Sequence, residues 1–412
     1  MKEKKVPAIR FQGFTDDWEQ RKVGNLYDFK NGLNKSKEFF GTGVPIVNFT
    51  DVFHHRGLIA SQLYGRVSLT PEEVHNFLVK KGDIFFTRTS ETIEEIGYPS
   101  VMLDTPKDTV FSGFVLRGRS IEDSDPLDDL FKKYVFFTKS FRSEMTKKSS
   151  MTTRALTSGT SIKKMLFQYP ESKKEQHQIG LCITELDNLI ALHQHKLTKL
   201  QLLKKSMLTK MFPKDGARVP EIRFQGFHGD WKERKLGEVM ESYSGGTPSV
   251  GIKEYYGGDI PFIRSAEINS ESTELFLTNA GLNNSSARLV SQGDILYALY
   301  GATSGEVGRA RLSGAINQAI LAIKPNNGYD SEYITQWLQK NKQNITDTYL
   351  QGGQGNLSGT IVKEFLVKFP TYNEQHKIGR YFRNIDNTIV LYQRKLSKLQ
   401  KIKQAMLSKL FV

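Results

Sequence analysis

The chain is poor in cysteine and in long apolar runs. Cys182 is the only cysteine among 412 residues, so a disulfide framework and a cysteine-based zinc site are both excluded. No apolar run approaches the ~20 residues that a membrane span requires. Because disulfides accumulate in oxidising compartments, we expect this protein in the cytoplasm, away from membranes.

The short motifs of common catalytic sites are also missing. The chain has no G-x-x-x-x-G-K-[ST] phosphate loop, no G-x-G-x-x-G dinucleotide turn and no G-x-S-x-G nucleophile elbow. Its eight histidines include no H-E-x-x-H pair, and the Asn/Asp-Pro-Pro-aromatic motif of amino-methyltransferases is absent. We therefore expect no catalytic residue, metal site or cofactor in this chain. A self-contained nuclease or methyltransferase is the less favoured alternative.

What the chain does contain is a long segment written twice. Residues 175–212, EQHQIGLCITELDNLIALHQHKLTKLQLLKKSMLTKMF, return at 374–411 as EQHKIGRYFRNIDNTIVLYQRKLSKLQKIKQAMLSKLF. About 20 of the 38 aligned positions are identical, which indicates an internal duplication. A second pair precedes it, because VPAIRFQGFTDDWEQRKVGNL (6–26) returns as VPEIRFQGFHGDWKERKLGEV (219–239). The chain is therefore two tandem halves. Each half has a lead-in (6–26 or 219–239), a body of about 145 residues and a long helix.

Apolar residues in both copies of the long segment recur about every 3.5 residues, which is the spacing of a coiled-coil seam. The residues we expect to pair the helices are Ile179, Ile183, Leu186, Ile190, Leu197 and Leu200 in the first copy, and Ile378, Phe382, Ile385, Ile389, Leu396 and Leu399 in the second. Since a seam needs a partner helix, we predict that the two copies pair with each other. A helix of about 40 residues would be roughly 60 Å long.

The net charge of the chain is +14, and most of it is concentrated in the two long segments. Segment 171–212 has seven lysines against four acidic residues, and segment 371–412 has nine basic residues against two acidic ones. Together they carry about +10 of the total. This surplus indicates helix faces that attract a polyanion or an acidic protein, or simply solvated helix surfaces.

The two bodies share only scattered landmarks. GDIFFTR (82–88) matches GDILYAL (293–299), where a Gly-Asp turn leads into an apolar strand, and YVFFTKSFR (134–142) matches YITQWLQKN (333–341), which we expect to be a helix in both. Many short strands, glycine-rich turns and few helices indicate an α+β body. A duplicated scaffold with diverged bodies favours one task performed on two different targets.

The duplicated EQHxIG helices and IRFQGF-x-x-x-W lead-ins resemble those of the specificity subunit of type I restriction-modification systems. SGGTPSVGIKEYYGGDIPFIRSAEI (244–268) is similar to the opening of target-recognition domains in that family, and NLSGTIVKEFLVKFPTYNEQHKIG (356–379) resembles the exit into its spacer helix. The resemblance implies two pseudo-symmetric target-recognition domains, 1–170 and 213–370. They would be separated by spacer helices, 171–212 and 371–412, that pair as an antiparallel coiled coil.

The resemblance also implies the partners. Each target-recognition domain would read half of a split double-stranded DNA site, and the helices would set the spacing and dock two modification subunits. Those subunits would bind S-adenosylmethionine and methylate adenine at N6, while restriction subunits would use ATP and magnesium. Half-sites read from one face of DNA lie about 34 Å apart. The alternative left open is a coiled-coil adaptor that does not touch DNA.

Candidate DNA contacts follow from residue type, since Lys and Arg bind phosphates while Arg, Asn, Gln, Ser and Thr read base edges. We favour the polar loops after the Gly-Asp strands, together with basic, aromatic and amide residues of other loops. Each candidate could equally be a solvated loop residue. They are Lys35, Lys37, Thr87, Arg88, Thr89, Ser90 and Arg154 in the first half, and Lys253, Tyr255, Arg264, Tyr300, Thr303, Ser304, Arg309, Gln351, Gln354 and Asn356 in the second.

Overall fold

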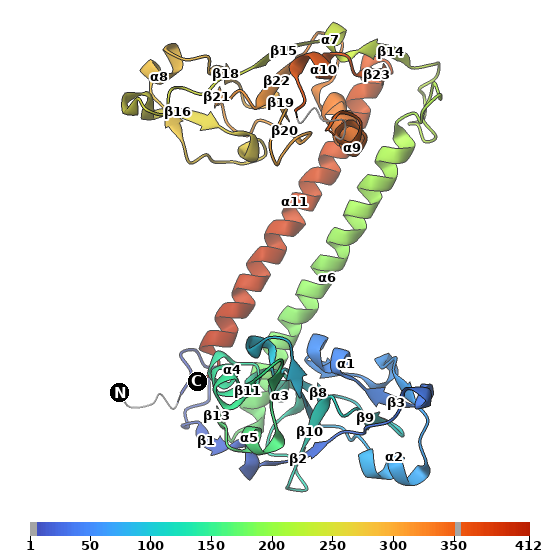
Figure 1. Ribbon diagram of the computed structural model, residues 1–412, viewed down its shortest axis with the longest axis vertical. Helices are drawn as coiled ribbons and strands as arrows, with labels where there is room; N and C mark the ends of the chain where they lie inside the picture. Colours follow the sequence, from blue (N-terminus) through green and yellow to red (C-terminus); the bar gives the residue numbers. More distant parts are fainter. Residues whose placement is uncertain (1–5, 351–355) are drawn as a thin grey trace. The chain divides into compact units, whose positions relative to one another are not determined.

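A computed structural model describes residues 6–350 and 356–412. The chain divides into two compact units (Figure 1). Unit 1 comprises Met1–Gln194 with Lys395–Val412, and unit 2 comprises His195–Arg394. Each unit therefore contains one body, the first part of the long helix that follows this body, and the last part of the other long helix.

The main sheets of the two units have the same plan. In unit 1 the strand order is β2 (Tyr27–Asn31), β10 (Val115–Ser120), β6 (Ile84–Thr87), β8 (Pro99–Met102) and β4 (Gly57–Leu58). In unit 2 it is β15 (Met240–Ser244), β22 (Ile320–Pro325), β19 (Ile295–Ala298) and β20 (Val307–Arg309). The strand that follows a Gly-Asp pair, β6 or β19, lies between two antiparallel neighbours in both units.

A second sheet repeats this correspondence. Its strands in unit 1 are β5 (Arg66–Val67), β3 (Phe40–Val47) and β9 (Val110–Phe111), and in unit 2 they are β17 (Phe276–Leu277), β16 (Tyr256–Ile263), β21 (Gly314–Ile316) and β18 (Arg288–Val290). The long strands β3 and β16 each have one parallel and one antiparallel neighbour, and each contains a register shift. Bodies with little sequence in common therefore share one topology.

Each lead-in pairs with the strand that precedes the long helix of its own half. In unit 1 β1 (Glu19–Lys22) is antiparallel to β13 (Leu166–Tyr169), and in unit 2 β14 (Lys232–Lys235) is antiparallel to β23 (Leu366–Phe369). Unit 1 has a further sheet, formed by β11 (Ser150–Met151), β12 (Ala155–Leu156) and β7 (Thr89–Ser90). The shorter helices are α1 (Phe49–His54), α2 (Pro71–Phe77), α3 (Asp129–Val135), α4 (Lys139–Lys148), α5 (Gly159–Lys163), α7 (Leu236–Val239), α8 (Asn279–Asn283), α9 (Ser331–Leu350) and α10 (Gly359–Lys363).

The predicted helix over residues 134–142 is wrong, whereas the one over 333–341 is confirmed. In unit 1 the segment is split, because α3 ends at Val135 and α4 begins at Lys139. Thr138 caps the second helix, since its hydroxyl accepts a hydrogen bond from the Phe141 amide at 3.4 Å. In unit 2 the single helix α9 runs through the corresponding residues.

The two long helices, α6 (Lys173–Met211) and α11 (Tyr372–Lys409), are confirmed and run antiparallel within each unit. None of the predicted helix-pairing residues is exposed. Buried ones are Ile179, Ile183, Leu197, Ile378, Phe382, Ile385 and Leu396, and half-buried ones are Leu186, Ile190, Leu200, Ile389 and Leu399. The predicted α+β class is likewise confirmed. No helix in the described part of the chain is long and apolar enough to cross a membrane.

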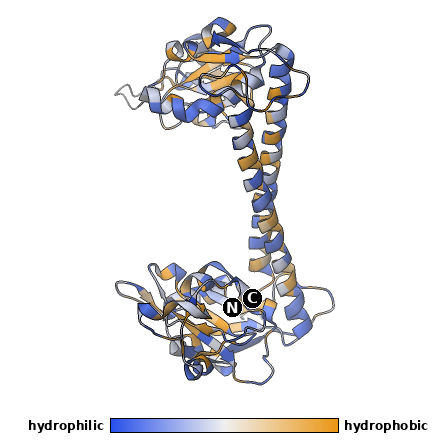
Figure 2. Cartoon of the chain, turned by 90° about the vertical axis from the view of Figure 1, so that its right-hand side faces the viewer, coloured by the Kyte–Doolittle hydropathy of each residue, from blue (hydrophilic) through white to orange (hydrophobic). Residues whose placement is uncertain are grey.

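The C-terminal end of each long helix packs into the core of the other half's body: the end of α11 lies in unit 1 and the end of α6 lies in unit 2. In unit 1 Phe411 stacks on Phe131, with ring centroids 5.4 Å apart, and packs edge-on against Trp18. In unit 2 Phe212 packs against Tyr333, at 5.1 Å. Figure 2 shows apolar residues gathered on the strands of both bodies, whereas the long helices alternate apolar and polar residues. Each core thus depends on both repeats.

Candidate nucleic-acid interface

The first residue of each EQH motif is a buried glutamate that holds the lead-in. The Arg10 guanidinium binds the Glu175 carboxylate with two hydrogen bonds of 2.7 and 2.8 Å, and Trp18 donates its indole N–H to the same carboxylate at 3.4 Å. Arg223 binds Glu374 in the same bidentate way, at 2.6 and 2.8 Å. Hydrogen bonding to the glutamates raises the pKa of both arginines. This pairing explains why the two sequence repeats occur together, because a buried carboxylate requires a charged partner.

The glutamine and histidine of the motif hold the body itself. Gln176 accepts a hydrogen bond from the Asp128 amide at 2.6 Å and donates one to the Pro170 carbonyl at 2.8 Å. His177 Nδ1 lies 3.1 Å from the Asp128 carboxylate, which also caps α3. In unit 2 Gln375 and His376 make the same contacts with Asp330, at 3.0 Å each. The EQH motif therefore fixes the start of each long helix on its body.

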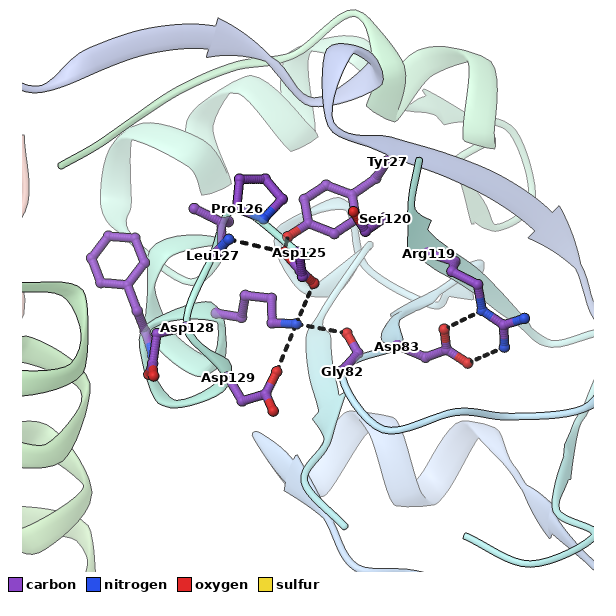
Figure 3. Close-up of polar contacts among 12 residues, drawn as sticks. Tyr27, Gly82, Asp83, Arg119, Ser120, Asp125, Pro126, Leu127, Asp128 and Asp129 are labelled. Carbon is purple, nitrogen blue, oxygen red and sulfur yellow. Dashed lines mark hydrogen bonds and ion pairs between the residues drawn. The ribbon is translucent and has the colours of Figure 1, made fainter. Parts of the chain in front are cut away.

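The Gly-Asp turns are also structural, as Figure 3 shows for unit 1. Gly82 has a φ of +83°, which favours glycine, and Asp83 makes two hydrogen bonds of 2.6 and 2.7 Å with Arg119. Beside them the fully buried Lys132 donates to the Gly82 carbonyl and pairs with Asp125 and Asp129, at 2.7–2.8 Å. These contacts fix the start of the central strand β6.

The counterpart in unit 2 has the same geometry. Gly293 has a φ of +96°, and Asp294 lies 3.4 Å from Lys324 on the neighbouring strand. The Asp294 carboxylate also accepts a hydrogen bond from the Ser291 amide at 2.9 Å. The shared Gly-Asp pair therefore positions the strand and the residues that follow it.

The prediction of a polar loop at residues 87–90 is wrong. Thr87 ends β6, is fully buried, and accepts a hydrogen bond from the Tyr98 amide at 2.9 Å. Thr89 and Ser90 form β7, which pairs with β12, and Ser90 is buried. Arg88 is half-buried and reaches the Gly113 carbonyl at 3.5 Å. Thr87 is thus buried in the main sheet as the last residue of β6, and Ser90 is buried in the extra sheet of unit 1.

The basic candidates of the first half differ in whether their side chains are paired with an acidic residue or exposed to solvent. Lys35 pairs with Glu73 at 2.6 Å and lies over the Phe39 ring. Lys37 and Arg154 are exposed, Lys37 in the short turn before β3 and Arg154 between β11 and β12. Of the predicted contacts in unit 1, these two side chains are the best placed to reach a phosphate.

Two arginines of the second half are tied to acidic residues of unit 2. Arg264 pairs with Glu267 at 2.8 Å and with Glu274 at 2.9 Å, and both carboxylates raise its pKa. Arg309 donates to the Gly293 carbonyl at 2.5 Å and lies 3.3 Å from Glu332. Both guanidinium groups are therefore held by carboxylates of their own unit, with Glu267 close to Arg264 in the sequence and Glu332 distant from Arg309.

The other candidates of the second half lie in loops and turns. The loop predicted after β19 is confirmed; in it Thr303 and Ser304 are half-buried, and Tyr300 packs against the core. Lys253 and Asn356 are exposed, and Tyr255 is half-buried. Gln351 and Gln354 lie outside the described residues. The described candidates of the second half therefore belong to several different loops and turns of its body.

Sequence reasoning missed a pair of equivalent ion pairs that join the long helices. Lys403 of α11 lies 2.5 Å from Asp187 of α6, and Lys204 of α6 lies 2.7 Å from Asp386 of α11. Each aspartate also binds the adjacent body, because Tyr134 donates to Asp187 and Gln336 to Asp386, at 2.8 Å each. The signal was available, since both lysines occupy seam positions where an apolar residue is expected.

The described residues contain no group of three or more His, Cys, Asp or Glu side chains that could hold a metal ion. The arrangement offers rigidly mounted loops, exposed cations and amide side chains. Those groups can bind phosphates and read base edges.

Comparison with known proteins agrees with this architecture. A family model described as type I restriction modification DNA specificity domain matches residues 15–202 and again 228–401. The type I restriction enzyme MjaX specificity subunit of Methanocaldococcus jannaschii is 22% identical over 99% of this chain and 96% of its own length. The MjaIX specificity subunit of the same organism is 31% identical over 184 residues, which is 42% of each chain.

The fold has a counterpart among solved structures. The S subunit of a type I restriction-modification system from M. genitalium superposes with a TM-score of 0.68 at 18% identity, covering 99% of both chains. Because the family model matches twice and accounts for most of the residues, this chain belongs to the family of type I restriction modification DNA specificity domains.

Proposed function

We propose that this chain is the sequence-specific DNA-binding subunit of a type I restriction-modification complex. Each body reads one half of a split double-stranded DNA target, and the paired helices set the spacing between the halves. The observation that carries the proposal is the double match to a DNA specificity domain within one chain. The surplus of about +10 on the two helical segments and the exposed Lys37, Arg154 and Lys253 support it.

Salt dependence tests direct DNA binding. Neutralising phosphates releases counterions, so the affinity for duplex DNA is expected to fall by about 10³-fold or more between 50 and 200 mM salt if six or more phosphates are contacted. Fluorescence anisotropy of a labelled duplex at a series of salt concentrations measures the slope. The adaptor hypothesis predicts no binding to DNA at any of these concentrations.

The chemistry comes from partner subunits. Two modification subunits bind S-adenosylmethionine and methylate adenine at N6, and restriction subunits use ATP and magnesium. The specificity subunit supplies no catalytic residue and works in the cytoplasm. Incubating the purified chain with labelled S-adenosylmethionine and DNA tests this division of labour, because any methyl transfer without added protein contradicts it.

Exposed leucines on the long helices support docking of two partner copies. Leu192 on α6 and Leu391 on α11 occupy equivalent positions of the repeat, and their exposed fractions are 46% and 49%. Leu181 and Leu189 of α6 are also exposed. Exposed apolar side chains that recur on one element mark a contact surface. The duplication supplies one such site in each unit, which fits two modification subunits.

Replacing Leu192 and Leu391 by glutamate is expected to weaken binding of the modification subunit about tenfold or more, because each charge would be buried in the contact. Each single replacement should remove one of two bound copies. Isothermal titration calorimetry measures the affinity and the stoichiometry. Gln201→Glu, at another exposed position of α6, is the control and should bind two copies. Unchanged binding by the double variant would show that these leucines do not contact the modification subunit.

A further inference from the structure

Unit 2 contains a hollow of about 450 Å³ between its body and the first part of α11. Its walls come from the end of β20 and the residues after it, from α9 and from α11. The polar groups that line it include Arg309, Arg311, Gln336, Gln339 and Arg383. This volume lies within the 300–1,000 Å³ range of small-molecule sites.

The charge of this hollow is positive. Its two carboxylates are already paired, since Glu332 faces Arg309 at 3.3 Å and Asp386 binds Lys204 at 2.7 Å. Arg311 and Arg383 are exposed, and neither forms an ion pair with any residue in 6–350 or 356–412. Two guanidinium groups that line the hollow, one from the segment after β20 and one from α11, therefore remain available for an oxyanion, which arginine binds with paired hydrogen bonds.

A buried acceptor lies beside these arginines. Gln336 is fully buried and donates through Nε2 to Glu332 at 3.1 Å and to Asp386 at 2.8 Å. Its Oε1 has no hydrogen-bond partner among the described residues. An unsatisfied buried acceptor destabilises the free protein, so a ligand that donates an O–H or N–H to this oxygen would gain affinity.

The equivalent positions of unit 1 carry larger side chains. Asp128 and Asp330 make the same contacts with the EQH motifs, which aligns α3 and α9. This alignment is shifted by three residues from the sequence match of 134–142 with 333–341, so that Tyr134 corresponds to Gln336. Tyr134 binds Asp187 just as Gln336 binds Asp386, and its hydroxyl also lies 3.1 Å from Thr184. The neighbouring Lys133 and Phe137 correspond to Thr335 and Gln339. The Tyr134 hydroxyl of unit 1 is therefore satisfied by Asp187 and Thr184, whereas the Gln336 oxygen of unit 2 has no partner among the described residues.

We propose that the hollow of unit 2 binds a phosphate ester. Its oxyanion lies between Arg311 and Arg383, and a hydroxyl or N–H of the same molecule donates to Gln336 Oε1. The phosphate ester comes either from a free mononucleotide or from the backbone of bound DNA. The DNA backbone as the source depends on the proposed function, whereas a free mononucleotide does not.

The test uses the full chain and two probes. Calorimetry with adenosine 5′-monophosphate reports the free ligand, and anisotropy with duplex DNA at several salt concentrations reports the backbone. The variants are Arg311→Gln with Arg383→Gln, and Gln336→Tyr, which installs the residue found in unit 1. The matched control, Arg218→Gln with Arg234→Gln, removes the same charge from exposed arginines of unit 2 that do not line the hollow.

The double arginine variant and Gln336→Tyr are both expected to bind one of the two probes at least tenfold more weakly than the control does. Loss with the mononucleotide alone identifies a free ligand. Loss with DNA, together with a salt slope smaller by about one to two in the arginine variant, identifies the backbone. If both variants bind both probes as the control does, the site is overturned. If the wild-type chain binds no DNA, the proposed function fails while the mononucleotide experiment still decides the site.

Because Arg311 and Arg383 are exposed, the double arginine variant is expected to fold, and it still tests the site if Gln336→Tyr does not fold. Thermal melting of every variant establishes that unit 2 is intact before binding is compared. Gln336→Tyr is expected to melt at or above the wild-type temperature, because the new hydroxyl can bind Asp386 as Tyr134 binds Asp187.

Discussion

Phe411→Ala is expected to destabilise the first body by about 3–5 kcal/mol, although residue 411 is almost at the opposite end of the sequence. Phe411 lies in the core of unit 1, against Trp18 and Phe131, and alanine would leave a cavity there. Hydrogen exchange read by mass spectrometry should show lost protection in β6 and α3 and unchanged protection in β19 and α9.

Phe212→Ala is the matched variant for this experiment. Phe212 occupies the equivalent place in unit 2, where it packs against Trp231 and Tyr333. It should remove protection from β19 and α9 and leave β6 and α3 unchanged. The opposite outcome, in which Phe411→Ala affected only the second body and Phe212→Ala only the first, would contradict the finding that each helix end packs into the body of the other half.

A fragment of residues 1–212 is expected to form a homodimer rather than a folded monomer. Alone it lacks Leu410 and Phe411, which complete the core of unit 1. It does carry their equivalents at the end of α6, where Phe212 corresponds to Phe411 and Lys204 to Lys403. A second copy can therefore supply the missing aromatic ring and pair its Lys204 with Asp187, as Lys403 does in the full chain.

Light scattering after size-exclusion chromatography measures the mass of this fragment. The dimer should dissociate and unfold in one concentration-dependent transition, and Phe212→Ala in the fragment should abolish it. A stable, folded monomer would contradict the shared cores. Because both bodies of the dimer are identical, it is expected to read a symmetrical version of the target.

The long helices were predictable because their signal is local and repeated. The 3.5-residue spacing fixes which face is buried, and the duplication identifies the partner helix. The Gly-Asp strands were predictable for a similar reason, since a turn residue with positive φ precedes an apolar run. Residues 87–90 were mispredicted because the strand that pairs with them, β12, lies more than sixty residues further along the chain.

The candidate DNA contacts were harder to predict, because the state of a charged side chain depends on distant partners. Arg309 meets Glu332, and Lys35 meets Glu73, only once the chain is folded. The hollow of unit 2 was not predictable at all, since Arg311, Gln336 and Arg383 come from three separate segments. Residue type indicates what a side chain can bind, but only the fold shows whether it is free to do so.

Mapping methylated adenines in DNA from cells that carry this chain with the proposed modification subunit tests the central claim most directly. Two readers on one spacer predict a split motif, with two short specified blocks and an unspecified gap of fixed length. Removing the gene for this chain should abolish that methylation. Methylation that persists without the chain, or that follows a single undivided motif, would contradict the account.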